Sequence, residues 1–412
     1  MKDTSAPSLA ITGASVILPE EIVETDVVIA DGVIQSIGRE EAADNTLDAR
    51  GLILAPAIID VHGDAFERQI MPRAGVFAPL DIALLDTDRQ LAANGIATAY
   101  HALTLSWEPG LRSVDRAAEV IRGLTALAPR FMVENRIQLR WETFAFEALD
   151  LIEEALAGPL LPSIAFNDHT SMTMRAFDVA IQDREFELSP DFTIAALDDA
   201  RMVQRTTKKA ERANMSDDEY RALLGQIWGR RGEVDATISK VAGMGRKAGA
   251  PMLSHDDTRT ETREYYRALG VDVAEFPMVT EAATAAKDAD EPIIFGAPNA
   301  MRGGSHIGSL AAADMVEAGM CDALASDYFY PSLLGAIARL DAERRAERPA
   351  LWSLVSSGPA RAMRLNDRGS ISPDKRADLT LLDWPDGATP AVRQTIVAGR
   401  TAFAGTPLGA VG

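Results

Sequence analysis

Short apolar runs alternate with longer amphipathic segments between residues 56 and 364. The apolar runs predict eight buried strands, because each is short and is bounded by polar or turn residues. These strands end near His62, His101, Glu142, His169, His255, Glu275, Gly296 and Asp327. Helix-like stretches between them include residues 88–94, 114–126, 280–287 and 309–318. Eight strand–helix units predict an α/β fold of the (β/α)8 TIM-barrel type, whose active site lies at the carboxyl ends of the strands.

The two ends of the chain carry strand patterns without such helices. Residues 14–18 and 26–30 are apolar or alternating, and Asp31-Gly32 predicts a tight hairpin into residues 33–38. Near the other end, residues 379–383 and 394–400 have the same character. We therefore expect residues 1–55 and 365–412 to form one composite β-sandwich domain, and residues 56–364 to form the barrel domain.

Residues 183–247 interrupt the alternation with a long, charged segment. Ser216 and Glu219 form a capping-box pattern ahead of an amphipathic run, which predicts helix. We expect a helical insertion that covers the mouth of the barrel. Its basic run at 205–212 is interpreted as a solvated face, with contact to a substrate as the alternative.

Composition narrows the classes of partner. The net charge of −20 over 412 residues repels nucleic acid and anionic membranes, so an anionic substrate needs a local arginine cluster. The start of the chain has no apolar run typical of a secretory signal, and no stretch approaches the ~20 apolar residues of a membrane span. The single cysteine, Cys321, excludes an internal disulfide and fits a reducing compartment. We expect a cytoplasmic protein, and a homo-oligomer remains open.

Metal-ligating residue types stand at the predicted strand ends. His62-Gly63-Asp64 places two ligands two residues apart, and the glycine between them is expected to leave space for a metal. Asp327 ends the last strand and comes beside the first when a barrel closes. The complete candidate set is His62, Asp64, Glu142, His169, His255 and Asp327. For any one of these residues alone, a buried hydrogen-bonded side chain is the alternative.

Six such side chains suffice for two divalent ions, with Glu142 bridging them. Nitrogen and oxygen ligands without thiolate suit zinc, manganese or iron. Two ions share a water and lower its pKa, and Asp327 then serves as both ligand and general base. Arg302 and His306, in a glycine-rich loop, offer groups that grip phosphate oxygens, and Arg73 supplies a second guanidinium. His101 is expected to contact the substrate or to support the ligands.

Several motifs together give the chain a family resemblance. They are residues 51–56, His62-Gly63-Asp64, 254–257, 275–277, 296–299, 302–306, 326–328 and 377–379. On these the chain resembles the amidohydrolase superfamily, and within it the alpha-D-ribose 1-methylphosphonate 5-triphosphate diphosphatases; the superfamily more commonly has His-x-His in the first motif. The resemblance implies metal-dependent attack at phosphorus in a small anionic triphosphate, with release of pyrophosphate, in phosphonate metabolism.

The residues near the expected mouth depart from that family pattern. Residues 170–174 read Thr-Ser-Met-Thr-Met where the family is closer to Ser-Pro-Gly-Gln, residues 65–68 lack the family's polar turn, and His101 replaces an acidic residue. A paralogue with another substrate is therefore one alternative. Hydrolysis of a C–N bond in an amide, or deamination, is a second, since the same activated water attacks carbon. A non-catalytic assembly protein is a third and would lack ligands. Several arginines near the metals favour phosphate, whereas an apolar pocket with a single arginine favours an amide.

Overall fold

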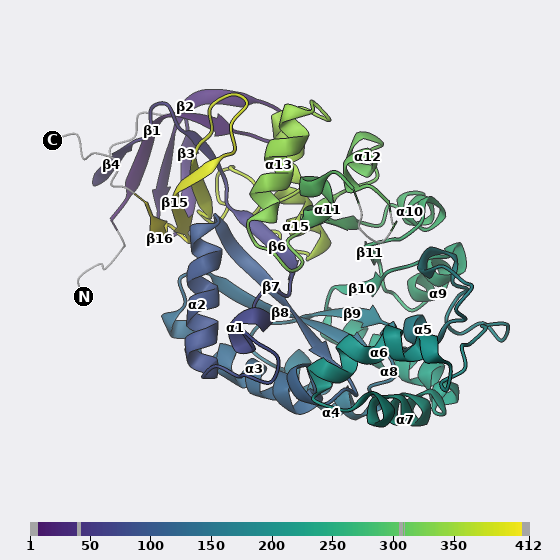
Figure 1. Cartoon of the computed structure of the whole chain (residues 1–412). Coiled ribbons are helices and arrows are strands. Elements are labelled where there is room, and N and C mark those ends of the chain that lie inside the picture. The colour runs from purple at the N-terminus through teal and green to yellow at the C-terminus, as the bar shows by residue number, and fades with distance from the viewer. Residues whose placement is uncertain (1–6, 39–42, 305–307, 309, 406–412) are drawn as a thin grey trace.

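The computed structural model describes residues 7–38, 43–304, 308 and 310–405, and within these residues the named strands form two sheets (Figure 1). The first sheet combines both ends of the chain in the order β16-β15-β14-β5-β1-β2-β3, with β4 paired to β1. Its strands are β1 (Leu9–Ile17), β2 (Ile22–Ala30), β3 (Val33–Ile37), β4 (Asn45–Asp48), β5 (Ile53–Pro56), β14 (Leu379–Asp383), β15 (Ala391–Val397) and β16 (Arg400–Ala404). Leu54 of β5 and Leu381 of β14 pair in antiparallel register and are fully buried, so the sheet joins segments more than 300 residues apart.

The predicted hairpin joins β2 to β3. Ala30 pairs with Val33, which leaves Asp31 and Gly32 as a two-residue turn. Both have positive φ, 51° and 80°, the combination that a type I′ hairpin requires. Glycine tolerates this conformation and Asp is among the residues that adopt it most often, so the local sequence determines the turn.

The second sheet is the predicted barrel of eight parallel strands, taken in chain order. They are β6 (Ile58–Gly63), β7 (Ile96–Leu105), β8 (Glu134–Glu142), β9 (Ser163–Asn167), β10 (Met252–His255), β11 (Val273–Glu275), β12 (Ile293–Gly296) and β13 (Ala323–Ala325). Ile59, Tyr100, Leu253 and Ile294 from different strands pack together with no more than 2% of their surface exposed. The barrel interior is therefore a filled core beneath the strand ends.

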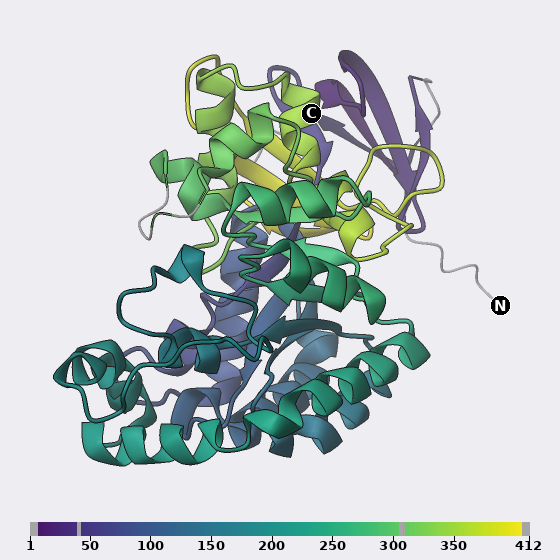
Figure 2. The ribbon, with the colours of Figure 1, turned by 90° about the vertical axis from the view of Figure 1, so that its right-hand side faces the viewer.

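Helices surround the strands (Figure 2). Those before β10 are α1 (Glu67–Ile70), α2 (Leu80–Ala93), α3 (Val114–Leu127), α4 (Leu149–Leu156), α5 (His169–Met174), α6 (Ala200–Ala213), α7 (Asp217–Trp228) and α8 (Val234–Ala248). Those after it are α9 (Thr260–Ala268), α10 (Thr280–Lys287), α11 (Ala297–Arg302), α12 (Ala312–Glu317), α13 (Ser332–Ala342), α14 (Arg348–Ser353) and α15 (Ser357–Ala362). The helix predicted at 88–94 is the second half of α2, which begins directly after Pro79. No helix of the described chain is long and apolar enough to cross a bilayer.

The first and last strands of the barrel meet at a seam. Near the carboxyl ends, Asp327 N donates to His62 O and Asp64 N donates to Asp327 O, each at 2.9 Å. Toward their amino ends, the two strands bond instead to residues 354–355, which lie between α14 and α15. Ile59 N donates to Val355 O, and Leu324 N donates to Leu354 O. Direct pairing is therefore concentrated next to the predicted ligands.

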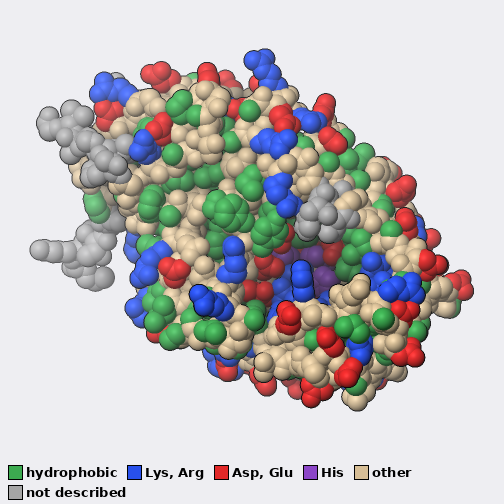
Figure 3. Space-filling model, viewed as in Figure 1, with side chains coloured by type: hydrophobic (Ala, Val, Ile, Leu, Met, Phe, Trp, Pro, Cys, Tyr) green, Lys and Arg blue, Asp and Glu red, His purple; other side chains and the backbone are tan. Residues whose placement is uncertain are grey.

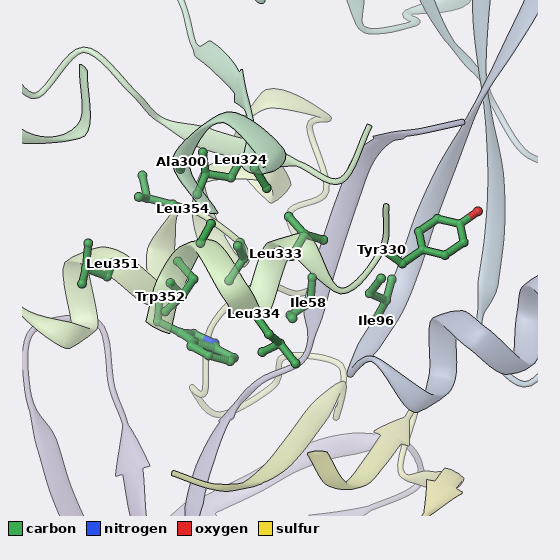
Figure 4. Close-up of a cluster of buried hydrophobic side chains, with 14 of the residues drawn as sticks. Ile58, Ile96, Ala300, Leu324, Tyr330, Leu333, Leu334, Leu351, Trp352 and Leu354 are labelled. Atoms are coloured by element: carbon green, nitrogen blue, oxygen red, sulfur yellow. The ribbon is translucent and has the colours of Figure 1, made fainter. Parts of the chain in front are cut away.

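An apolar cluster packs outside this seam (Figure 4). Leu333, Leu351 and Leu354 pack there with Ile58 of the first barrel strand, and all belong to one buried core. Trp352 joins them and its Nε1 donates to Pro56 O at 2.9 Å. These contacts fix the segment that bridges the lower part of the seam.

A buried ion network lies at the amino end of the barrel strands. Glu134, the first residue of β8, accepts a hydrogen bond from Arg368 at 2.9 Å and another from Arg376. Arg368 is 7% exposed and also donates to Thr98 on β7 at 2.9 Å. The network joins the barrel to the segment that leads into β14.

The segment expected to be an insertion contains three helices with different roles. Helices α6 and α7 pack on each other, and the predicted capping box of Ser216 and Glu219 begins α7. Helix α8 instead buries Val234, Ile238 and Val241 in the core shared with Leu139 of β8. The third helix thus packs on the barrel core, where Ile227 near the end of α7 joins it, and the expectation that the segment covers the mouth stays a prediction.

Candidate metal-dependent active site

The histidine side chains at the carboxyl ends of the strands lie close together. His62 belongs to the end of β6, His169 begins α5 after β9, and His255 is the last residue of β10. The ring centroids of His62 and His255 are 5.5 Å apart, and those of His169 and His255 are 5.8 Å apart. Figure 3 shows histidine surfaces at the floor of a hollow, between acidic and basic side chains. The three imidazoles therefore share one site.

An irregularity in β6 aims His62 at the barrel interior. Between Asp60 and Gly63, β6 contains one more residue than the matching interval of β7. A bulge of this kind breaks the strict alternation of side chains along a strand. His62 consequently reaches across the barrel to Glu275 on β11.

A carboxylate holds the Nδ1 atom of each imidazole. The pairs are His62 with Glu275 at 3.0 Å, His169 with Glu142 at 2.5 Å and His255 with Asp256 at 3.0 Å. Such a partner fixes the orientation of the ring and leaves Nε2 available, which is the arrangement that metal-binding histidines usually have.

The opposite nitrogens of two of these imidazoles have no hydrogen-bond partner among the described residues. Among the described residues, His62 Nε2 and His255 Nε2 are buried without a hydrogen bond, and so is Glu275 Oε2. A buried polar atom without a partner is costly, so these three atoms fit a ligand that accepts their lone pairs. A divalent cation meets that requirement, and the donor set of imidazole and carboxylate suits it.

Ligand atoms gather in three overlapping groups, each within 4.8 Å. They are His62–Asp64–Asp327, His62–His255–Glu275 and His169–His255–Asp256. Five of the predicted ligands occur in these groups, together with Asp256 and Glu275, which the sequence did not mark as ligands. Glu275 could have been chosen because it ends a predicted strand. Asp256 directly follows His255 but offered no separate signal.

Glu142 faces His169 in the described structure. One of its oxygens lies 2.5 Å from His169 Nδ1, and the other accepts from the backbone N–H of His169 at 3.1 Å. Both oxygens are thus engaged by a single residue, which suits a role in orienting that histidine.

Gly63 permits a close contact on the outside of β6, which differs from the expected reason for this glycine. A Cβ atom there would lie 2.7 Å from Asp60 Oδ2, 3.0 Å from Tyr330 Cε1 and 3.1 Å from Ser326 Oγ. These neighbours belong to β6 itself and to the chain around the seam. The glycine is therefore needed for close packing at the seam, and the expectation that it leaves space for a metal stays a prediction.

Left-handed backbone recurs just after the strands that carry the site. Asp256, Phe276 and Asp327 have φ of 61°, 55° and 54°, a region that non-glycine residues seldom occupy. Phe276 packs edge-on against His62 and His255, with ring centroids 5.1 Å from each. Strain of this kind persists where the surroundings impose it, which is common at functional sites.

Burial and neighbouring charges shift the pKa values in the cluster. Burial raises the pKa of Asp327, and the nearby carboxylate of Asp64 raises it further. Burial opposes ionisation of Glu275, but the facing His62 outweighs it and the pKa of Glu275 is lowered. The same pair raises the pKa of His62 despite its burial.

Basic side chains surround the cluster. Arg140 of β8 reaches the site, with Nη1 3.4 Å from Asp64 Oδ2 and Nε donating to Asn167 at 3.2 Å. Arg112 lies 4.0 Å from the same Asp64 oxygen and forms an ion pair with Glu67 at 2.9 Å. Neither arginine was predicted, because their approach depends on which strands face each other across the barrel.

The predicted substrate-binding residues have different positions. Arg302 lines a hollow of about 790 Å³ together with Arg140, His255 and Asp327. His306 lies outside the described residues. Arg73 is exposed in the loop before α2 and does not line that hollow.

His101 lies inside β7, which continues to Leu105, so it does not end its strand as expected. It is 1% exposed, and its Nε2 lies 2.8 Å from Asn135 Oδ1. Its ring packs edge-on against Phe66. These neighbours enclose the ring between the barrel and its surrounding helices.

A cluster of imidazoles and carboxylates at the carboxyl ends of barrel strands defines a hydrolase of the metal-dependent barrel class. The chain belongs to the Amidohydrolase family, whose sequence model matches residues 172–403. It is 29% identical over 385 residues to the alpha-D-ribose 1-methylphosphonate 5-triphosphate diphosphatase of Escherichia coli (strain K12), covering 92% of this chain and 96% of the relative.

Solved structures agree in fold. Molinate hydrolase matches with a TM-score of 0.61 at 14% identity, over 99% of this chain and 97% of that one. An adenosine deaminase from Xanthomonas campestris, with bound zinc, matches with a TM-score of 0.62 at 13% identity, over 96% and 93%. At these identities the likeness concerns the fold alone.

Proposed function

We propose that this hydrolase cleaves a phosphoanhydride of a ribose phosphonate triphosphate and releases pyrophosphate. The similarity to the diphosphatase of Escherichia coli extends over nearly the whole chain. The observation that carries the proposal is the number of cations beside the ligand cluster. Arg140 and Arg302 line one hollow, and Arg112, Lys209 and Arg212 line a second one. Several cations within reach of the ligands suit a substrate with many negative charges.

We propose that the cluster holds two divalent ions, zinc first among zinc, manganese and iron. The Nε2 atoms of His62, His169 and His255 and the carboxylates of Asp64 and Asp327 would be the ligands. When bound, such ions lower the pKa of a water and stabilise negative charge on the reacting oxygens. Glu142, Asp256 and Glu275 would hold the three rings in place, so Glu142 orients His169 in this scheme instead of bridging the ions.

Asp327 is the proposed proton carrier. Its backbone is fixed on both sides by the hydrogen bonds of the seam to His62 and Asp64. Burial and the carboxylate of Asp64 raise its pKa, which makes it a better base than an exposed aspartate. It would take the proton of the attacking water at a carboxylate oxygen and pass it to the leaving group.

A panel of substrates tests this function against cleavage of a C–N bond. The full chain is stripped of metal and reloaded separately with zinc, manganese or iron, and the stripped protein is the control. Release of pyrophosphate and phosphate from ribose triphosphates is compared with release of ammonia or amine from cyclic and N-acyl amides. We expect metal-dependent release of pyrophosphate. Turnover of an amide without pyrophosphate from any ribose triphosphate would refute the proposal.

A further inference from the structure

A second hollow of about 430 Å³ shares no lining residue with the one that contains Arg302. It is smaller, and its lining includes Glu142 and His169. Three cations from two separate parts of the chain line it as well: Arg112, before α3, and Lys209 and Arg212, on α6. Cationic side chains therefore line a second compartment at the ligand cluster, separate from the hollow that contains Arg302.

The cations of this compartment differ in how they are neutralised. Arg112 forms an ion pair with Glu67 at 2.9 Å, and Arg212 forms one with Glu108 at 2.5 Å. Lys209 Nζ donates to the hydroxyl of Thr173 at 2.5 Å, and no carboxylate of the described residues forms an ion pair with it. Burial lowers the pKa of Lys209, although Glu108 and Glu142 act in the opposite direction. A sheltered ammonium without a paired carboxylate favours an anion in the adjoining space.

Helix α6 is fixed in a position that directs these side chains toward the site. Arg205 Nη1 donates to Thr173 O at 2.8 Å and to Arg175 O at 2.5 Å, which ties the helix to α5. Lys209 and Arg212 lie three residues apart and therefore on one face of the helix. Lys208 is exposed on another face. The basic run of α6 is thus divided, and only part of it is the solvated face expected from the sequence.

We propose that Lys209, supported by Arg112 and Arg212, forms a subsite for the pyrophosphate end of the triphosphate substrate. This inference rests on the proposed function. The larger hollow, with Arg140 and Arg302, would then receive the ribose phosphonate part. His169 borders the smaller hollow and His255 the larger one, so the phosphoryl group that is attacked lies between them.

The chemistry of the cleavage explains the need for a cation there. The water oxygen bonds to the phosphorus next to the ribose, and the bond from that phosphorus to its bridging oxygen breaks. The electron pair leaves on the pyrophosphate, while the proton of the water passes through Asp327. Negative charge therefore develops on the group that faces Lys209, and a fixed cation stabilises it.

The test compares two neighbouring lysines of α6. Binding of inorganic pyrophosphate and of orthophosphate to the zinc-loaded full chain is measured by calorimetry, with zinc content checked before and after. The variant is Lys209→Met, and the matched control is Lys208→Met, which removes an equal charge from the exposed face. Thermal midpoints establish that both variants are folded.

We expect Lys209→Met to weaken binding of pyrophosphate about tenfold or more and Lys208→Met to change it less than about twofold. Orthophosphate, which needs only the metal side of the site, should bind Lys209→Met within about twofold of the unchanged protein. Equal pyrophosphate binding by a folded Lys209→Met protein overturns the subsite, and so does failure of the unchanged protein to bind pyrophosphate. Pyrophosphate binding that depends on Lys209, without release of pyrophosphate from any ribose triphosphate, supports the subsite and refutes the reaction.

Discussion

Asp327 combines two tasks at the level of a single residue, because its main chain closes the barrel and its carboxylate faces the site. The substitution Asp327→Asn keeps the main-chain hydrogen bonds to His62 and Asp64, and it removes the base together with the charge of a proposed metal ligand. We expect turnover to fall at least about 100-fold while KM for the triphosphate changes only a few-fold. Steady-state kinetics with metal content measured in parallel checks this. Near-normal turnover would exclude Asp327 as the proton carrier.

His101 makes stability depend on pH. Burial lowers its pKa from 6.5 to about 4 in the folded protein. As the pH falls below about 6.5, the unfolded chain binds a proton that the folded chain does not bind until about pH 4, so stability is lost over this interval. We expect the loss between pH 7 and pH 4.5 to be about 2 kcal/mol smaller in His101→Gln than in the unchanged protein. Urea unfolding at the two pH values measures the difference, and equal losses in both proteins would contradict it.

The sequence located the histidines of the cluster better than the carboxylates that hold them. His62, His169 and His255 follow short apolar runs, so a barrel places them at one end whatever the details of its packing. The partnership of Glu275 with His62 depends on which strands face each other across the barrel and on a bulge in β6. No local pattern contains that information. His101 also follows a short apolar run, but it does not end its strand, because β7 continues beyond it and its ring is enclosed.

At the level of elements, local sequence signals predicted the hairpin turn and the helix cap. They did not predict which helices of residues 183–247 pack on the barrel core. Asp31-Gly32 specifies its turn with two residues. Helix α8 has the same charged, amphipathic pattern as α6 and α7, and only the structure shows that α8 and the end of α7 pack on the barrel core. A pattern of apolar spacing shows which face of a helix is buried but not which surface covers it.

The capping box at α7 gives a testable local stability. The side chain of Ser216 accepts from the N–H of Glu219, and the side chain of Glu219 accepts from the N–H of Ser216. We expect Ser216→Ala to lower the free energy of opening of α7 by about 1 kcal/mol. Native-state hydrogen exchange of the amides in residues 217–228 measures it, with the amides of α3 as the internal reference. Unchanged exchange in α7 would show that the cap does not stabilise this helix.

At the level of the whole molecule, the ion network at the amino end of the barrel connects the two sheets. Glu134→Gln would remove the charged acceptor that Arg368 and Arg376 share, while Arg368 keeps its pairing with Asp367. We expect this change to cost about 2 kcal/mol of stability, because two sheltered arginines lose a charged hydrogen-bond acceptor. Turnover at saturating substrate should remain, since the network lies at the end opposite the site.

Glu147→Gln is the matched control for that network. Glu147 pairs with Arg230 at 2.9 Å, and its side chain is 60% exposed, so its loss should cost less than about 1 kcal/mol. Denaturation midpoints in urea for both variants check the contrast. Similar small effects from the two substitutions would show that the network contributes little to stability.

The position of the seam determines when the site is complete during synthesis of the chain. Residues 62–64 emerge from the ribosome long before Asp327, and the strands between them can pair in order as they appear. The nascent chain therefore contains all three imidazoles of the cluster well before it has Asp327, which joins the barrel ends and would complete the proposed ligand set. Metal binding by the full proposed set would have to wait for residue 327, and a ribosome that stalls before residue 323 would leave a product with histidines at the strand ends and an open barrel.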